Sequence, residues 1–252
     1  KPLCEAYRRG QQLRKDPALL PSTLFTLLAR SRRRASLVLA GKWDGVGRLC
    51  GSRAGDFDST LEGGTLHFRH FDSRDSSADA MLECTELALR HVEALLDSSG
   101  PDVIALYIDA IDTAGHLNGF GLDIPAYMRS IADVDARLSS LLAAVGARRA
   151  KGEDWQVVVT TDHGGTTQAR MPEHLRRTFA DCACVQKGIA QTGLPGIHGL
   201  VDMWQHTQTF LIVAGGRDID PGEMLPAPRP EDVVPTVLRH VLGEDFRAGE
   251  LG

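Results

Sequence analysis

The sequence predicts an α/β fold in which helices flank a mainly parallel β-sheet on both faces. Short apolar runs of strand length alternate with long amphipathic segments, as they do in successive βαβ units. The chain has 252 residues, of which 42% are hydrophobic and 24% are charged, an ordinary globular composition. No internal repeat, low-complexity stretch or linker divides the chain. We therefore expect residues 1–252 to form a single domain.

The first four predicted elements precede residue 100. Residues 23–29 follow a proline and a serine and carry an apolar stripe, which is typical of a helix start. Residues 36–40 form an apolar run of strand length. Residues 66–71 alternate apolar and polar side chains and predict a half-exposed strand. Residues 76–96 keep an apolar face over several turns before a Ser-Gly-Pro stop, so they predict a long helix.

The remaining elements continue the alternation. Residues 103–108 are apolar throughout, as expected for a strand whose two faces are both covered. Residues 125–145 predict a second long amphipathic helix. Two further apolar runs, residues 156–161 and 209–213, predict buried strands, and residues 232–242 predict a closing helix. Together these elements favour a sheet with helices on both sides.

Composition and charge exclude several classes of function. The chain has 28 Lys plus Arg against 33 Asp plus Glu, a formal net charge of −5. We expect no binding to nucleic acid polymers, because such binding needs a concentrated basic face. The longest apolar runs are too short to form a transmembrane segment. The five cysteines form no CxxC pair, which argues against a zinc ribbon or a disulfide scaffold.

Two predicted strands each deliver one carboxylate and one imidazole to the same edge of the sheet. The two pairs are Asp112 with His116 after residues 103–108, and Asp162 with His163 after residues 156–161. Ligands of open α/β sheets bind beyond the carboxyl ends of the strands. Carboxylate oxygen together with histidine nitrogen is a normal donor set for zinc or manganese. Two such pairs at one edge indicate two ions rather than one.

Each pair alone also has a structural interpretation. Asp162 could be a turn residue beside a surface His163. Asp112 could cap the following turn, and His116 could hydrogen-bond a carbonyl. Because both pairs directly follow apolar strands, metal binding is favoured when they are considered together.

A third histidine can reach the same edge. His198 lies 12 residues ahead of Phe210, which belongs to the strand predicted at residues 209–213. With Asp112 and His116, His198 would complete a three-ligand site with an open position, the arrangement of catalytic metal sites. His174 and His206 are further imidazoles near these segments, and either could replace His198 as a ligand.

The order and spacing of these segments resemble the alkaline phosphatase superfamily, in particular its type I phosphodiesterases and nucleotide pyrophosphatases. The resemblance covers roughly residues 20 to 243. The segments that carry it are Asp112-x-x-Gly-His116-x-x-Gly119, Ile131-x-x-x-Asp135, Thr160-Thr-Asp-His-Gly164 and His198-Gly199.

This resemblance implies an alkaline-phosphatase-like fold and a metal-dependent hydrolase of phosphate esters. The implied cofactors are two divalent metal ions, with Zn²⁺ as the expected metal. Asp112, His116 and His198 would hold one ion, and Asp162 and His163 would hold part of the second. In such a site two ions coordinate the phosphoryl oxygens of the substrate. The substrate would be a small-molecule phosphate ester.

The family pattern also constrains the remaining features. In the family pattern the ligand aspartate lies three residues before the glycine of the Gly-His pair. This spacing to Gly115-His116 matches Asp112 and not the rival carboxylate of Asp109. Relatives are often secreted or membrane-anchored, so the resemblance gives a weak preference for those locations. Trp43 follows the strand predicted at residues 36–40, where it could line the substrate pocket with an aromatic face or simply pack against the protein. Residues 166–195 show no regular hydrophobic period and predict an irregular insertion that influences substrate choice.

The nucleophile of the family pattern is missing from the chain. That pattern has an opening strand that ends in an aspartate, followed by a threonine or serine at a helix start. Residues 1–20 are polar and show no buried strand. Residues 56–60 (Asp-Phe-Asp-Ser-Thr) are not preceded by an apolar strand and predict a turn. We therefore expect an N-terminally incomplete domain or a degenerate copy, whose nucleophile lies outside this chain.

Two alternatives to this function remain open. One is another branch of the superfamily: a phosphonate hydrolase, a phosphomutase or a phosphoethanolamine transferase. A sulfatase is disfavoured because the chain contains no Cys/Ser-x-Pro-x-Arg motif. The other alternative is a non-catalytic remnant that binds a metal or a partner.

Overall fold

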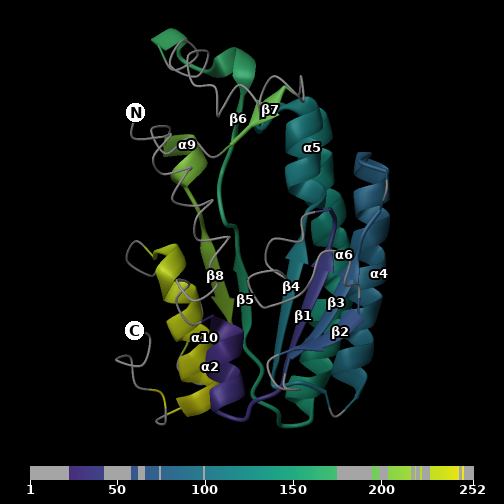
Figure 1. The fold of residues 1–252 in the computed structure, drawn as a ribbon, viewed down its shortest axis with the longest axis vertical. Coiled ribbons are helices and arrows are strands. Elements are labelled where there is room, and N and C mark those ends of the chain that lie inside the picture. The colour runs from purple at the N-terminus through teal and green to yellow at the C-terminus, as the bar shows by residue number, and fades with distance from the viewer. Residues whose placement is uncertain are drawn as a thin grey trace.

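Helices flank a β-sheet in the computed structural model of the protein (Figure 1). The structure describes residues 23–42, 58–61, 66–73, 75–98, 100–174, 195–198, 204–216, 219, 222, 228–243 and 246. Three parallel strands form the centre of the sheet, so the predicted α/β fold class is confirmed.

The four-stranded sheet has the order β2-β3-β1-β4. β1 (Ala35–Ala40) lies between β3 (Leu66–Phe71) and β4 (Val103–Ile108), and it is parallel to both. The last residue of β1 is level with the last residues of β3 and β4. The carboxyl ends of the three strands therefore share one edge, as the sequence predicts. β2 (Asp58–Leu61) pairs antiparallel with β3, so the turn predicted for this segment is wrong.

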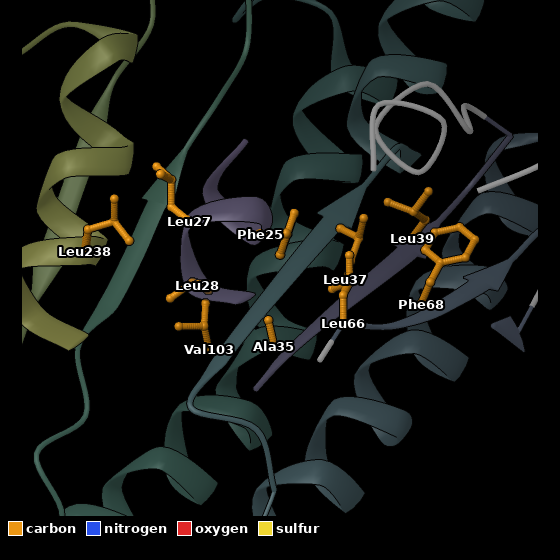
Figure 2. Close-up of a cluster of buried hydrophobic side chains, with 10 residues drawn as sticks. All are labelled: Phe25, Leu27, Leu28, Ala35, Leu37, Leu39, Leu66, Phe68, Val103 and Leu238. Atoms are coloured by element: carbon orange, nitrogen blue, oxygen red, sulfur yellow. The ribbon is translucent and has the colours of Figure 1, made fainter. Parts of the chain in front are cut away.

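One hydrophobic core lies between the sheet and the helices α2 (Leu24–Arg30) and α10 (Val233–Leu242). Figure 2 shows the buried side chains of this cluster, which extend from the two helices to strands β1, β3 and β4. The cluster consists of Phe25, Leu27, Leu28, Ala35, Leu37, Leu39, Leu66, Phe68, Val103 and Leu238. Alternate residues of β1 point into it, which is the period expected of a strand.

A second core lies on the opposite face of the sheet, under the helices α4 (Ala78–Asp97) and α6 (Pro125–Ala150). Its buried residues are Val38, Ala40, Cys84, Ala88, Val92, Leu96 and Val145. The helices predicted at residues 76–96 and 125–145 are confirmed, the second with an additional turn at its end. Because both faces of β1 are covered, all of its six residues are buried.

The two later strands form a separate antiparallel ribbon. β5 (Val157–Thr160) pairs with β8 (Leu211–Ala214), so both predicted strands exist. The prediction that they are buried is wrong, because Val159 is 37% exposed and its cross-strand partner Ile212 is 56% exposed. The physical reason is that among the described strands β5 pairs with β8 alone, so the ribbon is too narrow to be covered on both faces.

The edge of β4 that faces away from β1 is unpaired within the described part of the chain. Val103 and Asp109 donate their backbone N–H groups to β1 and the residue before it. Alternation along the strand therefore directs the backbone groups of Ile104, Leu106 and Ile108 to the opposite edge. β4 and β5 point the same way in Figure 1, and both end at the same rim of the molecule.

Several short elements complete the described structure. They are α5 (Ala110–Asn118), β6 (Thr166–Thr167), the 3-10 helix η3 (Gln168–Arg170), β7 (Gly196–Ile197), α9 (Trp204–Thr207) and the 3-10 helix η4 (Pro230–Asp232). β6 and β7 pair antiparallel and lie above the carboxyl ends of the strands (Figure 1). Among the described residues, no helix has both the length and the apolar character that a membrane span requires.

Candidate metal centre

The helix α5 follows β4 after a single residue and carries the first predicted pair of site residues. Asp112 lies in its first turn and His116 in its last turn, four residues later. This spacing places two side chains on the same face of a helix. The carboxylate Oδ2 of Asp112 consequently lies 3.3 Å from Nε2 of His116.

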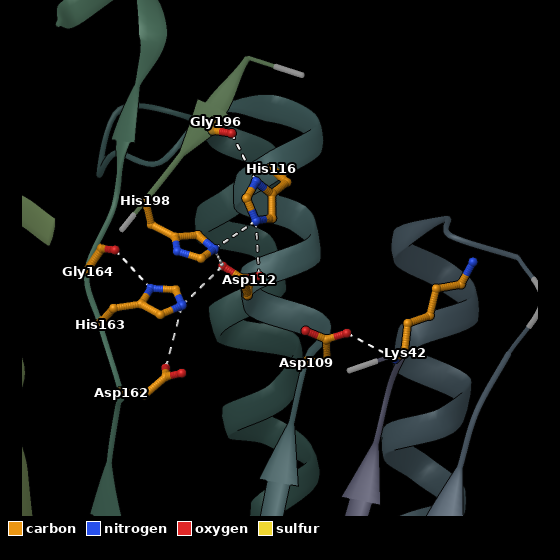
Figure 3. A network of polar contacts seen from close by, with 9 residues as sticks. All are labelled: Lys42, Asp109, Asp112, His116, Asp162, His163, Gly164, Gly196 and His198. Atoms are coloured by element: carbon orange, nitrogen blue, oxygen red, sulfur yellow. Dashed lines mark hydrogen bonds and ion pairs between the residues drawn. The ribbon is translucent and has the colours of Figure 1, made fainter. Parts of the chain in front are cut away.

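Two other segments bring imidazoles to the same carboxylate (Figure 3). The chain leaves β5 and places His163 beside Asp112, with Nε2 of His163 at 3.9 Å from Oδ1. The chain also leaves β7 and places Nε2 of His198 at 3.6 Å from the same oxygen. The stacked rings of His163 and His198 have centroids 3.7 Å apart and planes inclined by 14°. Asp112 is thus the common neighbour of imidazoles from three segments.

Backbone carbonyls orient two of these imidazoles. Nδ1 of His116 is 2.9 Å from the carbonyl oxygen of Gly196, and Nδ1 of His163 is 2.9 Å from that of Gly164. A carbonyl oxygen can only accept, so Nδ1 carries the hydrogen in each contact. When the ring is neutral, Nε2 then has a free lone pair directed towards Asp112. This is the usual arrangement around histidine ligands of metals.

The charges of the cluster are tightly linked. The hydrogen bond with Asp112 is the main reason that the pKa of His116 is raised. Burial lowers the pKa of His198 to about 4, so His198 is neutral at pH 7. Burial also acts to raise the pKa of Asp112, but the hydrogen bond and the charges of the imidazoles outweigh it and lower that pKa. The cluster therefore combines a carboxylate with at least one neutral imidazole, the forms that bind a metal ion.

One orphaned atom indicates that the cluster fits a divalent cation. Oδ1 of Asp112 is buried and has no hydrogen-bond partner among the described residues. One possible ligand atom from each of Asp112, His163 and His198 lies within 4.8 Å of the other two. Ligand atoms of a tetrahedral zinc ion lie about 3.3 Å apart. The 3.6 Å and 3.9 Å separations from Oδ1 are close to that spacing, so small side-chain movements would complete it.

All five predicted ligands lie near one another. The sequence assigns His116 to a site with Asp112 and His198, and in the structure a close group of possible ligand atoms combines Asp112 and His198 with His163. His116 remains a direct neighbour, with its Nε2 at 3.0 Å from Nε2 of His198. Asp162 lies at the outer side, 59% exposed, with Oδ1 at 3.7 Å from Nε2 of His163. The number of ions and the division of ligands between them remain predictions.

The other candidate residues differ in how near they lie to this cluster. The backbone carbonyl of His206 accepts a 3.1 Å hydrogen bond from the N–H of Gly164, next to His163. The carboxylate of Asp109 accepts a hydrogen bond of 3.0 Å from the backbone N–H of Lys42, at the ends of β4 and β1 (Figure 3). His206 is buried in α9, and His174 is exposed. Trp43 lies outside the described residues, as does most of the insertion predicted at residues 166–195.

Sequence reasoning missed that α5 is a helix. No element is predicted for residues 110–118 from the sequence, where Asp112 is weighed as the cap of a following turn. The four-residue spacing of Asp112 and His116 was the available signal, because ligands at this spacing share a helix face. The helix matters for the site because it holds these two side chains on one rigid element.

Comparison with known families gives an independent indication of what the site does. Residues 37–209 match the model of the family described as type I phosphodiesterase / nucleotide pyrophosphatase. The matched stretch is more than half of the chain and includes all five candidate ligands. A search of curated proteins found no match.

Proposed function

Because the chain belongs to the type I phosphodiesterase / nucleotide pyrophosphatase family of the alkaline phosphatase superfamily, we propose that its site is a two-zinc centre for the hydrolysis of phosphate esters. The proposed ligands are Asp112, His116, Asp162, His163 and His198. The proposed substrate is a small-molecule phosphate ester, as the family suggests.

The buried, unpartnered Oδ1 of Asp112 is the observation that carries this proposal. An unpartnered buried carboxylate oxygen is costly to the protein, and imidazole nitrogens at 3.6 Å and 3.9 Å are too far away to hydrogen-bond to it. A divalent cation between this oxygen and the neighbouring nitrogens would offset the cost. The family match independently supplies a reason for that cation to be there.

The chemistry of the reaction agrees with this ligand set. Bound divalent ions would supply the concentrated positive charge that phosphoryl transfer requires, and a chain of net charge −5 has little of it elsewhere. The protein's own part is to hold the ligands. The carbonyls of Gly164 and Gly196 keep His163 and His116 in one tautomer, and α5 fixes Asp112 at the carboxyl end of β4.

We also propose that a further β-strand, running between β4 and β5, completes the sheet and brings the nucleophilic threonine or serine to the site. Two observations support this strand. The facing edges of β4 and β5 are unpaired within the described residues, and both strands end beside the cluster. A cavity of about 410 Å³ lies between the beginnings of the two strands, where Val103 and Ile104 face Trp155 and Gln156.

Hydrolysis of an aryl phosphodiester in the presence of Zn²⁺ tests the proposed function. We expect His163→Ala to abolish hydrolysis in the protein that carries the nucleophile, because the variant removes a ligand. The control is His240→Ala, since His240 bonds the carbonyl oxygen of Asp154 through Nε2, away from the cluster. Normal turnover by His163→Ala, with circular dichroism showing an intact fold, would contradict the two-zinc assignment.

A further inference from the structure

Phe120 packs against two imidazoles of the candidate metal centre. It follows the C-terminal residue of α5 by two positions and is 7% exposed. Its ring meets those of His116 and His198 edge-on, with centroid distances of 5.6 Å and 6.3 Å. Its backbone carbonyl accepts a 3.1 Å hydrogen bond from the hydroxyl of Thr167 in β6. The position of Phe120 is therefore fixed both by the end of α5 and by β6.

Three glycines surround the ring of Phe120, and we call them the glycine socket: Gly115, Gly165 and Gly196. A Cβ atom on Gly115 would lie 2.1 Å from Cε1 of the ring, and one on Gly165 would lie 2.6 Å from Cγ. On Gly196 it would lie 2.9 Å from Cδ2, and still closer to the carbonyl oxygen of Gly115. Side chains at these positions would displace the ring, so close approach explains why each residue is a glycine.

Each glycine of the socket lies next to one of the imidazoles along the chain. Gly115 directly precedes His116, Gly165 follows His163 by two residues, and Gly196 precedes His198 by two residues. The ring of Phe120 thus contacts all three segments that carry imidazoles. A rigid ring in a close-packed setting fixes how near these segments can approach one another.

We propose that Phe120 is a positioning residue whose ring sets the spacing of the three imidazoles around Asp112. This inference rests on the metal site proposed above. Metal ligands must lie within a few tenths of an ångström of their ideal distances, and three loosely connected segments cannot hold that spacing by themselves. A smaller side chain at this position would leave space into which the three segments could shift.

Replacement of Phe120 by leucine tests the proposal, with Phe25→Leu as the matched control. Phe25 is also 7% exposed, but it lies in the core between α2 and the sheet. We measure the Co²⁺ affinity and the visible absorption spectrum of each folded variant. Phe120→Leu is expected to bind Co²⁺ at least about tenfold more weakly and with altered absorption bands. Phe25→Leu is expected to match the wild type in both. Unchanged affinity and spectrum in Phe120→Leu would overturn the proposal.

A metal-free measurement separates this inference from the proposed function. The rings of His163 and His198 are stacked, so the NMR signals of their ring protons are displaced by the neighbouring ring. We expect Phe120→Leu to move these signals towards the values of unstacked histidine, while Phe25→Leu leaves them in place. If the wild type binds no Co²⁺ but shows this difference, the proposed metal site fails and the positioning role stands. If neither variant moves the signals, the positioning role fails.

The glycine socket allows a reciprocal test. Gly115→Ala would place its Cβ 2.1 Å from Cε1, 2.4 Å from Cδ1 and 2.5 Å from Cζ of the ring, and leucine lacks Cε1 and Cζ. We expect Gly115→Ala to weaken Co²⁺ binding, and the double variant with Phe120→Leu to bind no more weakly than Phe120→Leu alone. The control is Gly146→Ala in α6, where the added Cβ meets nothing within 4 Å. If the losses of Co²⁺ affinity in the two single variants multiplied in the double variant, the two residues would act independently, which would contradict a shared contact.

Discussion

Two aspartates three residues apart have opposite surroundings at the end of β4. Asp109 is 6% exposed, and its carboxylate accepts a hydrogen bond from the backbone of Lys42. Asp112 has a buried oxygen without a hydrogen-bond partner among the described residues, and imidazoles surround it. A carboxylate with a hydrogen-bond donor is stable without a cation, whereas one with an orphaned oxygen gains from binding one. The difference in role therefore follows from the partners and not from the residue type.

Exchange of each aspartate for asparagine separates the two roles. Asp112→Asn is expected to weaken Zn²⁺ binding by at least about a hundredfold, because a neutral amide is a poor zinc ligand. Asp109→Asn is expected to change the affinity by less than about threefold, since its amide oxygen still accepts from Lys42. Isothermal titration with Zn²⁺ measures both values. Equal losses in the two variants would mean that the site is not centred on Asp112.

At the level of the elements, the open edge of β4 has a measurable consequence. The N–H groups of Ala105 and Tyr107 point towards β1, in line with those of Val103 and Asp109. Those of Ile104, Leu106 and Ile108 point to the unpaired edge. Parallel strands are normally paired on both sides, but among the described residues no strand pairs with half of this strand's amides or gives them the protection of the sheet.

Hydrogen exchange followed by NMR tests this alternation. We expect the amides of Ile104, Leu106 and Ile108 to exchange at least about tenfold faster than those of Ala105 and Tyr107. The residues of β1, which are paired on both sides, serve as an internal reference for full protection. Uniform protection along β4 would contradict this expectation and show that another segment of the protein pairs with the edge.

Periodicity predicted most elements because burial on one or two faces leaves a pattern in the sequence. β1 and β3 show this directly: six buried residues in the first and strict alternation in the second. The same reasoning failed for the surroundings of β5 and β8, since apolar side chains such as Ile212 do not reveal whether a neighbour covers them. It also failed for α5, which has too few residues to show a period.

At the level of the whole molecule, the sequence predicted which carboxylates and imidazoles lie near one another but not how their rings contact each other. Strand ends identified Asp112, His116 and His163, because parallel strands bring their carboxyl ends to one edge. The stacking of His163 on His198 depends on the path of the chain after β7, which no local pattern encodes. The contact between His116 and the carbonyl of Gly196 depends on the same path.

Metal binding should stabilise the whole fold, since the ligands come from α5 and from the segments after β5 and β7. At a free Zn²⁺ concentration of 100 times Kd, linkage gives about 2.7 kcal/mol of added stability. For a chain of this size that corresponds to a rise in Tm of about 5–11 °C. Differential scanning calorimetry with Zn²⁺ and with EDTA measures the change. Asp112→Asn is the control, which should show a rise of at most about 2 °C. A Tm insensitive to Zn²⁺ in the wild type would contradict the site.

The distribution of the imidazoles over three distant segments also affects folding kinetics. Asp112 and His116 lie on one helix and are neighbours as soon as α5 forms, whereas His163 and His198 join them only after long loops have closed. Closing such loops is slow compared with helix formation. Uptake of an ion into the complete cluster during refolding should therefore lag behind the recovery of helical signal. The rate of that uptake would report when the native topology is reached.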